Sequence, residues 1–185
     1  FIPCVNPDGY VYNQTTDPSG GGMWRKNRFN NGNGTFGVDL NRNYAENWGF
    51  DNFGSSPTTN SDTYRGTTPF SEVESKLVRD FCNTHDFKLA INNHTYGNYL
   101  IHPWGFIADS LTLDSVTFTS FGALMSQCSK FNSGTANQTV GYSANGTSDD
   151  WMYGEQTSKP KILAFTPEAG DQTDGFWPLQ SRIIP

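Results

Sequence analysis

The sequence predicts an α/β fold, in which a mixed, mostly parallel sheet is sandwiched by helices. Short apolar runs typical of buried strands alternate with longer segments that have helical periodicity. Loops separate them, because the chain contains 19 Gly and 10 Pro. A chain of 185 residues has the size of one domain and can bury a sizeable core. We therefore expect a single domain over residues 1–185.

The first third of the chain is predicted to be mostly loop. Residues 1–6 have the composition of a short strand, and the motif Asn6-Pro7-Asp8-Gly9 after them reads as a turn. Residues 11–36 and 47–68 are dominated by Gly, Asn, Thr and Pro, and loops of this length usually bind something. Because the chain starts inside what reads as a strand, we expect a piece of a longer protein, incomplete at both ends.

Two segments have the apolar periodicity of helices, and a third is a short helix. Ser71-Glu72-Val73-Glu74 is a capping box with Ser71 as N-cap, and the helix is predicted to run to about His85. A second helix is predicted over residues 113–130, and a short one opens at Asp149. The predicted buried faces consist of Val73, Leu77 and Phe81 in the first helix, and Val116, Phe121, Leu124, Met125 and Cys128 in the second.

Three strands are predicted, over residues 88–93, 99–102 and 161–166. The first strand is expected to be buried and leads to His94, while the third leads to Glu168. In open α/β sheets ligands bind beyond the carboxyl ends of strands. We therefore expect His94 and Glu168 to lie at a common site.

Charge, hydropathy and cysteine content exclude several classes of partner. The formal net charge of −6 argues against nucleic acid, which calls for a basic surface. No apolar run approaches the roughly 18 residues of a membrane span. Cys4, Cys82 and Cys128 show no metal-ligand spacing, and we expect the last two to be buried free thiols.

A cluster of arginines stands out in the loop-rich part of the chain. Trp24-Arg25-Lys26-Asn27-Arg28 is followed by Gly37-Val38-Asp39-Leu40-Asn41-Arg42-Asn43-Tyr44. Guanidinium groups suit a carboxylate, because two parallel N–H donors meet its two oxygens. The alternative is a cluster of loop ion pairs without further function, which the arginines alone leave equally open.

These motifs resemble those of the zinc carboxypeptidase family, the metallocarboxypeptidases of the pancreatic and bacterial A, B and T type. The family pattern runs Asn-Pro-Asp-Gly-aromatic, Trp-Arg-Lys-x-Arg and Gly-Val-Asp-x-Asn-Arg-Asn-aromatic, and three linked motifs are far more specific than one. The resemblance covers nearly the whole chain and continues through Tyr64-Arg65-Gly66, Pro69-Phe70-Ser71-Glu72, His94-Thr95-Tyr96-Gly97, Pro103-Trp104-Gly105 and Ile183-Ile184-Pro185.

The resemblance implies a partial peptidase catalytic domain that works with one zinc ion. His94, which from the residues alone is more often structural, matches the third zinc ligand of the family. The family takes its other two ligands from a His-x-x-Glu motif upstream of the Asn-Pro-Asp-Gly segment, and this chain has no such motif. Catalytic zinc normally has three protein ligands. We therefore expect two of the ligands to lie outside this chain.

The resemblance also assigns roles to the other candidate residues. Glu168, which could otherwise be a solvated strand-end carboxylate, matches the general base that takes a proton from the attacking water. Arg25 would stabilise the oxyanion that forms at the scissile carbonyl. The residues implied to bind substrate are Asn41 and Arg42 at the C-terminal carboxylate, the mobile Tyr142 that closes over it, and Tyr96 next to His94.

Asp149 is the candidate for side-chain specificity. By resemblance it occupies the base of the pocket, where an acid accompanies a preference for Lys or Arg, and Asp150 matches a structural aspartate. A buried carboxylate that faces a cationic side chain makes physical sense. The alternative is an acid that merely favours a helix N-terminus.

The sequence therefore predicts a zinc-dependent metallocarboxypeptidase that releases C-terminal residues, with basic ones favoured. Its expected partners are the C-termini of peptides or proteins, and we expect a secreted or periplasmic monomer. One alternative is a cell-wall peptidase of the same superfamily, acting on an acidic or diaminopimelate terminus. Another is a non-catalytic peptide-binding module, which would keep the arginines but lack a complete metal site.

Overall fold

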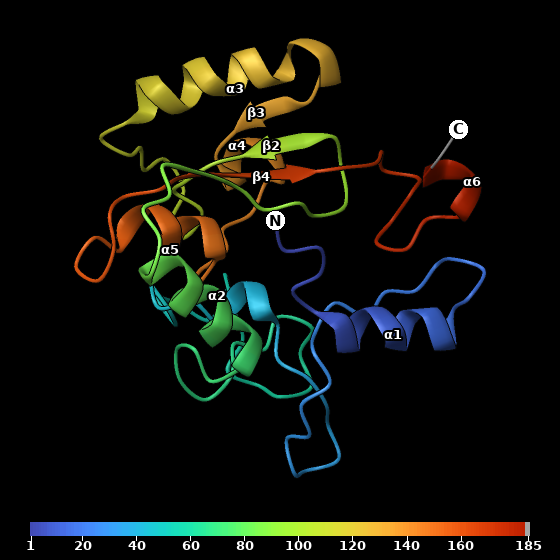
Figure 1. Cartoon of the computed structure of the whole chain (residues 1–185). Helices are drawn as coiled ribbons and strands as arrows, with labels where there is room; N and C mark the ends of the chain where they lie inside the picture. Colours follow the sequence, from blue (N-terminus) through green and yellow to red (C-terminus); the bar gives the residue numbers. More distant parts are fainter. Residues whose placement is uncertain (184–185) are drawn as a thin grey trace.

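The structure, a computed structural model, describes residues 1–183. Figure 1 shows the course of the chain. In chain order the elements are α1 (Pro7–Thr16), η1 (Leu40–Arg42), α2 (Val73–Asn83), β1 (Leu89–Ile91), β2 (Tyr99–Ile101), α3 (Ser115–Ser129), β3 (Asn132–Gly134), α4 (Ala136–Thr139), α5 (Ser148–Gly154), β4 (Leu163–Glu168) and α6 (Gln180–Ile183).

Four strands form one mixed sheet in the order β1-β4-β2-β3. The pair β1-β4 is parallel with Ala90 opposite Ala164, and β2-β3 is parallel with Leu100 opposite Ser133. Only β2-β4 is antiparallel, with Leu100 opposite Pro167. The predicted mixed, mostly parallel sheet is confirmed, and β4, the last strand in the chain, lies inside it.

Helices cover both faces of the sheet, and two neighbours in β4 show how. Successive side chains of a strand point to opposite faces. Ala164 packs in a core cluster with Val78 of α2 and Trp151 of α5. Phe165, the next residue, packs in a second cluster with Phe118 of α3. Accordingly, α3 lies above the sheet in Figure 1, and α2 and α5 lie below it.

The N-terminal segment differs from the sequence prediction, because the expected turn after residue 6 is the start of α1. The Oδ1 atom of Asn6 accepts a hydrogen bond from Gly9 N at 3.0 Å, which is an N-cap interaction, and Pro7 occupies the first turn, where it needs no donor. Residues 1–6 form no strand. The cap residue and the proline were signals for a helix as well as for a turn.

The predicted helices α2 and α3 exist, but their predicted buried faces are wrong. In α2, Val73 and Leu77 are 62% and 64% exposed, while Val78 and Cys82 are buried. The N-cap is Glu72, because Ser71 instead bonds the Glu72 carboxylate and the Asn43 amide. In α3 the buried residues are Phe118 and Gly122, whereas Val116, Phe121, Leu124, Met125 and Cys128 are exposed. Of the two thiols expected to be buried, only Cys82 is.

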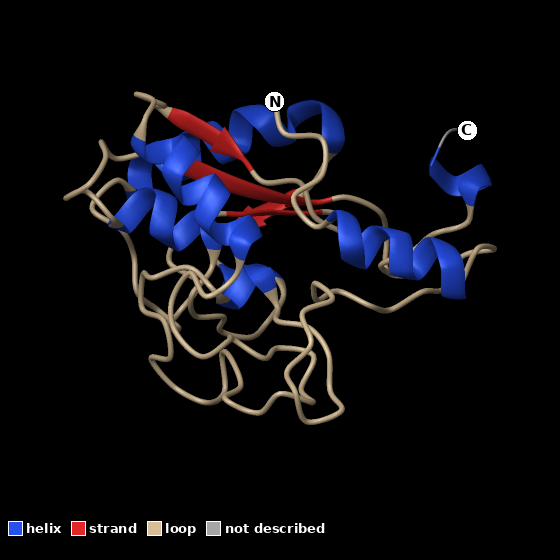
Figure 2. Cartoon of the chain, turned by 60° about the horizontal axis from the view of Figure 1, so that its bottom comes forward, coloured by secondary structure: helices blue, strands red, loops and turns tan. Residues whose placement is uncertain are grey.

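β1 was predicted as a buried strand, yet it forms an open edge of the sheet. Among the described residues it pairs only with β4, and Leu89 and Ile91 are 48% and 41% exposed. Most of the connecting chain before α2 is loop, as predicted for residues 47–68 (Figure 2).

Candidate active site

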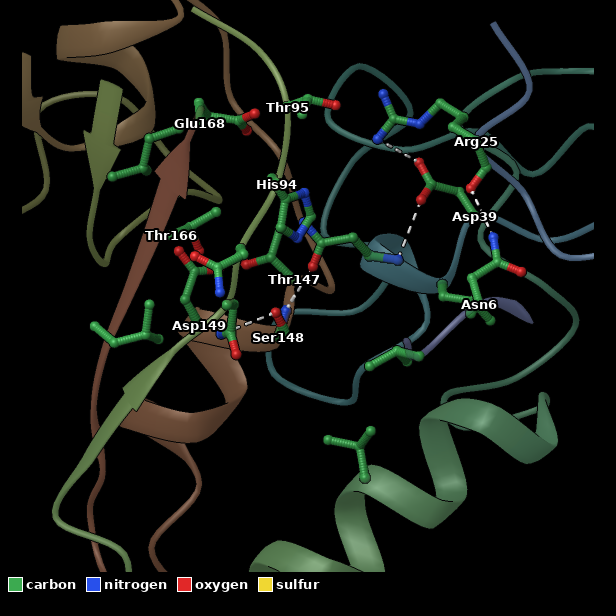
Figure 3. Close-up of a pocket in the computed structure, with 18 of the residues that line it drawn as sticks. Asn6, Arg25, Asp39, His94, Thr95, Thr147, Ser148, Asp149, Thr166 and Glu168 are labelled. Carbon is green, nitrogen blue, oxygen red and sulfur yellow. Dashed lines mark hydrogen bonds and ion pairs between the residues drawn. The ribbon is translucent and has the colours of Figure 1, made fainter. Parts of the chain in front are cut away.

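All eight predicted site residues line one cavity of about 960 Å³. Figure 3 shows Arg25, His94, Asp149 and Glu168 around it. They come from segments that are far apart in the sequence: the loop before η1, η1 itself, the chain after β1, the end of β4, and the loop and helix α5 near residue 150. The eight residues are Arg25, Asn41, Arg42, His94, Tyr96, Tyr142, Asp149 and Glu168.

His94 and Glu168 lie together because β1 and β4 are parallel neighbours. Beyond β1 the chain stays in register with β4, and His94 forms a parallel bridge with Glu168, the last residue of β4. His94 N donates to Pro167 O at 2.9 Å, and Ala169 N donates to His94 O at 2.9 Å. The site thus falls at the carboxyl ends of two parallel strands, as the sequence predicted.

Glu168 is held in a state suited to proton transfer. Burial raises its pKa to about 7, although the guanidinium of Arg25 acts in the opposite direction. Its Oε2 atom is buried and has no hydrogen-bond partner among the described residues. A carboxylate with a pKa near neutrality can both accept and return a proton at neutral pH.

His94 has the properties of a single metal ligand. Burial, followed by the charge of Arg25, lowers its pKa, so the ring is neutral and has a free nitrogen lone pair. Zinc prefers neutral imidazole nitrogen. However, no group of three or more His, Cys, Asp or Glu side chains that could hold a metal occurs in residues 1–183. Among the described residues, His94 fits one ligand position of a zinc site, and the remaining side chains do not complete that site.

Two arginines are organised around Asp39, which sequence reasoning left without a role. The Asp39 Oδ2 atom lies 3.0 Å from Arg25 Nη2 and 4.0 Å from Arg42 Nη1. Asp39 raises the pKa of Arg25, whereas burial lowers the pKa of Arg42. The Arg42 side chain is fixed further, because Nε donates to Gly54 O at 2.8 Å and Nη1 to Asn41 O at 2.7 Å.

Asn41 links the arginine cluster to α5. Asp39 Oδ1 accepts from Asn41 N at 3.1 Å and so caps η1. The side-chain Oδ1 of Asn41 accepts from Ser148 N, the first residue of α5, at 2.9 Å. Within the described part of the chain its Nδ2 has no partner, which leaves a donor at the cavity.

Asp149 is a buried carboxylate without a counter-charge. It is 5% exposed and forms no ion pair or side-chain hydrogen bond with any residue in 1–183. Its neighbour Asp150 is fully buried but accepts from Gly105 N at 2.9 Å and from Phe106 N at 3.1 Å. Burial, followed by the charge of Asp149, raises the pKa of Asp150 well above its usual range. In Figure 3, Asp149 lies across the cavity from Arg25.

Tyr96 and Tyr142 border the cavity, together with one residue that the sequence prediction missed. Tyr142 is 54% exposed and lies in the loop before α5. The ring centroids of Tyr96 and Phe176 lie 5.1 Å apart. The guanidinium carbon of Arg25 lies 5.7 Å from the centroid of the same Phe176 ring. Phe176 lies in an irregular segment with no periodicity or charge pattern, so no sequence signal identified it.

The observed fold agrees with what comparisons with known proteins show. The family model described as "Zinc carboxypeptidase" matches residues 1–185. Carboxypeptidase B of Astacus astacus is 36% identical over 194 residues, which cover 100% of this chain and 61% of that protein. Carboxypeptidase A4 of Mus musculus is 39% identical, with 100% of this chain and 43% of that protein covered. The chain belongs to the zinc carboxypeptidase family.

Solved structures lead to the same assignment. The crystal structure of thrombin activatable fibrinolysis inhibitor superposes with a TM-score of 0.79 at 33% identity, covering 95% of this chain and 46% of that one. The crystal structure of carboxypeptidase A from Helicoverpa armigera superposes with a TM-score of 0.75 at 31% identity, covering 90% of this chain and 41% of that one. The chain spans about half the length of the proteins that it matches, so it contains part of the fold that they share.

One property of the helices bears on membrane insertion. Among the described residues, none of the helices combines the length and the apolar character that a bilayer crossing requires.

Proposed function

We propose that this chain is part of the catalytic domain of a zinc-dependent carboxypeptidase that releases one C-terminal amino acid and favours Lys or Arg. One observation carries the proposal: a single cavity contains the arginines around Asp39, the raised-pKa Glu168 and the unpartnered Asp149. A peptide terminus with a cationic side chain has charges complementary to these groups, a carboxylate for the arginines and an ammonium or guanidinium for Asp149.

The substrate is held through its terminal carboxylate. Arg42 keeps a fixed direction because Gly54 O and Asn41 O hold its guanidinium. Asn41 adds its free Nδ2 donor, and the exposed Tyr142 closes over the bound end. A bound terminus in a cavity walled by fixed donors is positioned for reaction without further ordering.

Hydrolysis then needs a base and an electrophile. Glu168 removes a proton from water as the water oxygen attacks the scissile carbonyl carbon, and returns that proton to the amine nitrogen as the C–N bond breaks. Arg25, oriented by Asp39 at 3.0 Å, donates to the oxyanion. His94 would be one ligand of a zinc ion, which would supply Lewis-acid polarisation of the carbonyl.

The side-chain preference is tested with peptides that differ only in their last residue. In the protein as its source organism makes it (the natural protein), loaded with zinc, we expect Lys- and Arg-ended peptides to be cleaved faster than Phe- or Glu-ended ones. Asp149→Asn should lower kcat/KM for the Lys-ended peptide roughly 10- to 100-fold and change the Phe-ended one little, because a charge-assisted hydrogen bond is lost. Asp86→Asn is the matched control, since it removes the same charge from an exposed residue that pairs only with Lys88.

The alternatives give different results in the same assay. Equal rates for all termini in both wild type and Asp149→Asn would contradict the basic preference. Fast release of a diaminopimelate or acidic terminus would indicate a cell-wall peptidase, and peptide binding without any release would indicate a binding module.

A further inference from the structure

The two parts of the proposed carboxylate site, Arg42 and the Tyr142 loop, meet at one carbonyl group outside the cavity. Gly54 O accepts from Arg42 Nε at 2.8 Å and from Asn145 N at 3.3 Å. Neither Gly54 nor Asn145 lines the cavity. A shift of this carbonyl would therefore move the arginine and the loop together.

The side chain of Asn145 strengthens this connection. It is completely buried. Its Nδ2 donates to Asp51 Oδ1 at 2.8 Å, and its Oδ1 accepts from the hydroxyl of Ser55. Asp51 Oδ1 also accepts from Gly54 N at 2.7 Å, so the same carboxylate holds Asn145 and shapes the turn that presents Gly54 O. We call Asp51, Gly54 and Asn145 the Asn145 anchor.

Gly54 is required at its position by close approach rather than by its backbone angle. A Cβ atom added there would lie 2.6 Å from Asn145 Nδ2 and 3.1 Å from Asn145 N. The first separation is too short for any side chain, and Asn145 is fully buried and cannot retreat into solvent.

The anchor divides the loop into a fixed part and a free part. On the fixed side, Ala144 N donates to Gly105 O at 2.8 Å and Tyr44 N donates to Gly146 O at 3.0 Å. On the free side, Tyr142 is 54% exposed, and the chain before it is next held where Gly141 N donates to Ala136 O at 3.1 Å. An exposed tyrosine next to a fixed loop base is the arrangement expected of a closing loop.

We propose that Asn145 is a positioning residue, which through Asp51 and Gly54 sets where Tyr142 closes relative to Arg42. The inference rests on the proposed function, because it assigns the anchor to the recognition of the terminal carboxylate. It does not involve the metal or the base.

The first test measures the loop without any turnover. Asn145→Ala in the natural protein should increase amide hydrogen exchange in residues 140–147 and leave β4 unchanged. Asn52→Ala is the matched control: Asn52 lies on the same loop as Asp51, but among the described residues its side chain forms hydrogen bonds only with the Arg65 guanidinium, at 3.0 Å. Exchange that is unchanged by Asn145→Ala, or equally raised by Asn52→Ala, would overturn the proposal.

The second test separates positioning from general stability. Asn145→Ala should raise KM for a benzoyl-glycyl-lysine substrate about tenfold and change kcat less than about threefold, as expected for lost binding of the carboxylate. In a Tyr142→Ala background the same substitution should raise KM less than about twofold, because the two residues act on one interaction. An undiminished effect in that background would overturn the proposal.

Two further points keep the tests decisive. If Asn145→Ala fails to fold, Asn145→Ser replaces it, since Ser keeps part of the hydrogen bonding. If the natural protein releases no amino acid, the proposed function fails, while the exchange measurement still decides whether Asn145 anchors the loop.

Discussion

At the scale of single residues, the carboxyl group of Asp39 explains how two arginines can share one site. Oδ2 faces Arg25 and Arg42, and Oδ1 caps η1 through Asn41 N. Two guanidinium groups in a poorly solvated cavity repel one another unless an anion lies between them. Asp39 supplies that anion and leaves donor atoms of both arginines available for substrate.

Glu168 is the residue whose replacement should affect chemistry and not binding. Glu168→Gln keeps the shape and removes the base, so kcat should fall about a thousandfold. Affinity for a non-cleaved peptide analogue, measured by calorimetry, should stay within about threefold of wild type. Turnover that survives in Glu168→Gln would remove Glu168 as the base.

The candidate residues were predictable from the sequence because their motifs are linked and closely spaced. Arg25, Asn41 and Arg42 lie in two such motifs, and His94 and Glu168 lie at the ends of apolar segments that were predicted as strands. Phe176 and the Asn145 anchor were not predictable. Their positions depend on contacts between segments about 80 to 150 residues apart in sequence, such as Phe176 with Tyr96 and with Arg25, or Asn145 with Asp51.

At the scale of elements, helix α5 joins Asp149, the proposed specificity residue, to the core. Its first turn contains Asp149 at the cavity and Asp150 in the interior, and Trp151 is also buried. Lys159 Nζ donates to Met152 O and to Glu155 O at 2.7 Å, which satisfies carbonyls at the helix C-terminus. The position of Asp149 is therefore fixed by a short helix held at both ends.

We expect Asp150 to be the main residue that fixes the position of Asp149. Asp150→Ala leaves Gly105 N and Phe106 N without their acceptor, so the free energy of unfolding should fall by about 3 kcal/mol. Asp150→Asn keeps one acceptor oxygen and should therefore lower the free energy of unfolding by less than Asp150→Ala. Urea denaturation of the two variants checks the order; equal stability of Asp150→Ala and wild type would contradict the structural role.

The ion pair of Asp114 and Lys161 predicts a small dependence of stability on pH. The hydrogen bond from Lys161, with that from Tyr153, lowers the pKa of Asp114. A lowered folded-state pKa means that the stabilisation is present above the ordinary pKa of 3.8 and is lost as pH falls through the folded value.

Both partners of this pair are partly exposed, so Asp114→Asn should cost less than about 1 kcal/mol at pH 7. The difference in urea midpoint between the variant and wild type should shrink as pH falls through the folded pKa of Asp114, since below it the carboxyl is neutral in both states. A difference that is constant from pH 7 to pH 2 would show that charge is not the cause.

The existence of the longer elements was predictable, but the orientation of the helices was not. Leu77 and Val78 are adjacent apolar residues, and rotating α2 by one residue exchanges which of them is buried. The sequence offers two apolar stripes, and the sheet selects the one with Ser75, Val78 and Cys82. The short β3, α4 and α6 give too little pattern to be recognised.

At the scale of the whole chain, the candidate-site cavity lies beside β1, which is an edge strand of the sheet within residues 1–183. The cavity is lined by Leu89, Ala90 and Ile91 of β1 as well as by His94 and Glu168. The chain also spans only about half of its relatives. The mostly parallel sheet was predictable because it follows from the alternation of elements, whereas the exposure of β1 depends on which neighbours surround it.

Measuring bound zinc tests whether His94 belongs to a metal site whose other ligands lie outside this chain. In the natural protein we expect about one zinc per chain by elemental analysis, and His94→Ala should lower that value several-fold because a catalytic zinc has three protein ligands. His85→Ala is the matched control, since His85 is exposed at the end of α2 and bonds only Thr84 and Phe81 O. Residues 1–185 expressed alone should retain well under about 0.1 zinc, because a single imidazole binds the ion weakly. If the isolated chain instead holds close to one zinc, side chains within it must complete the site, and structures with metal should show them around His94.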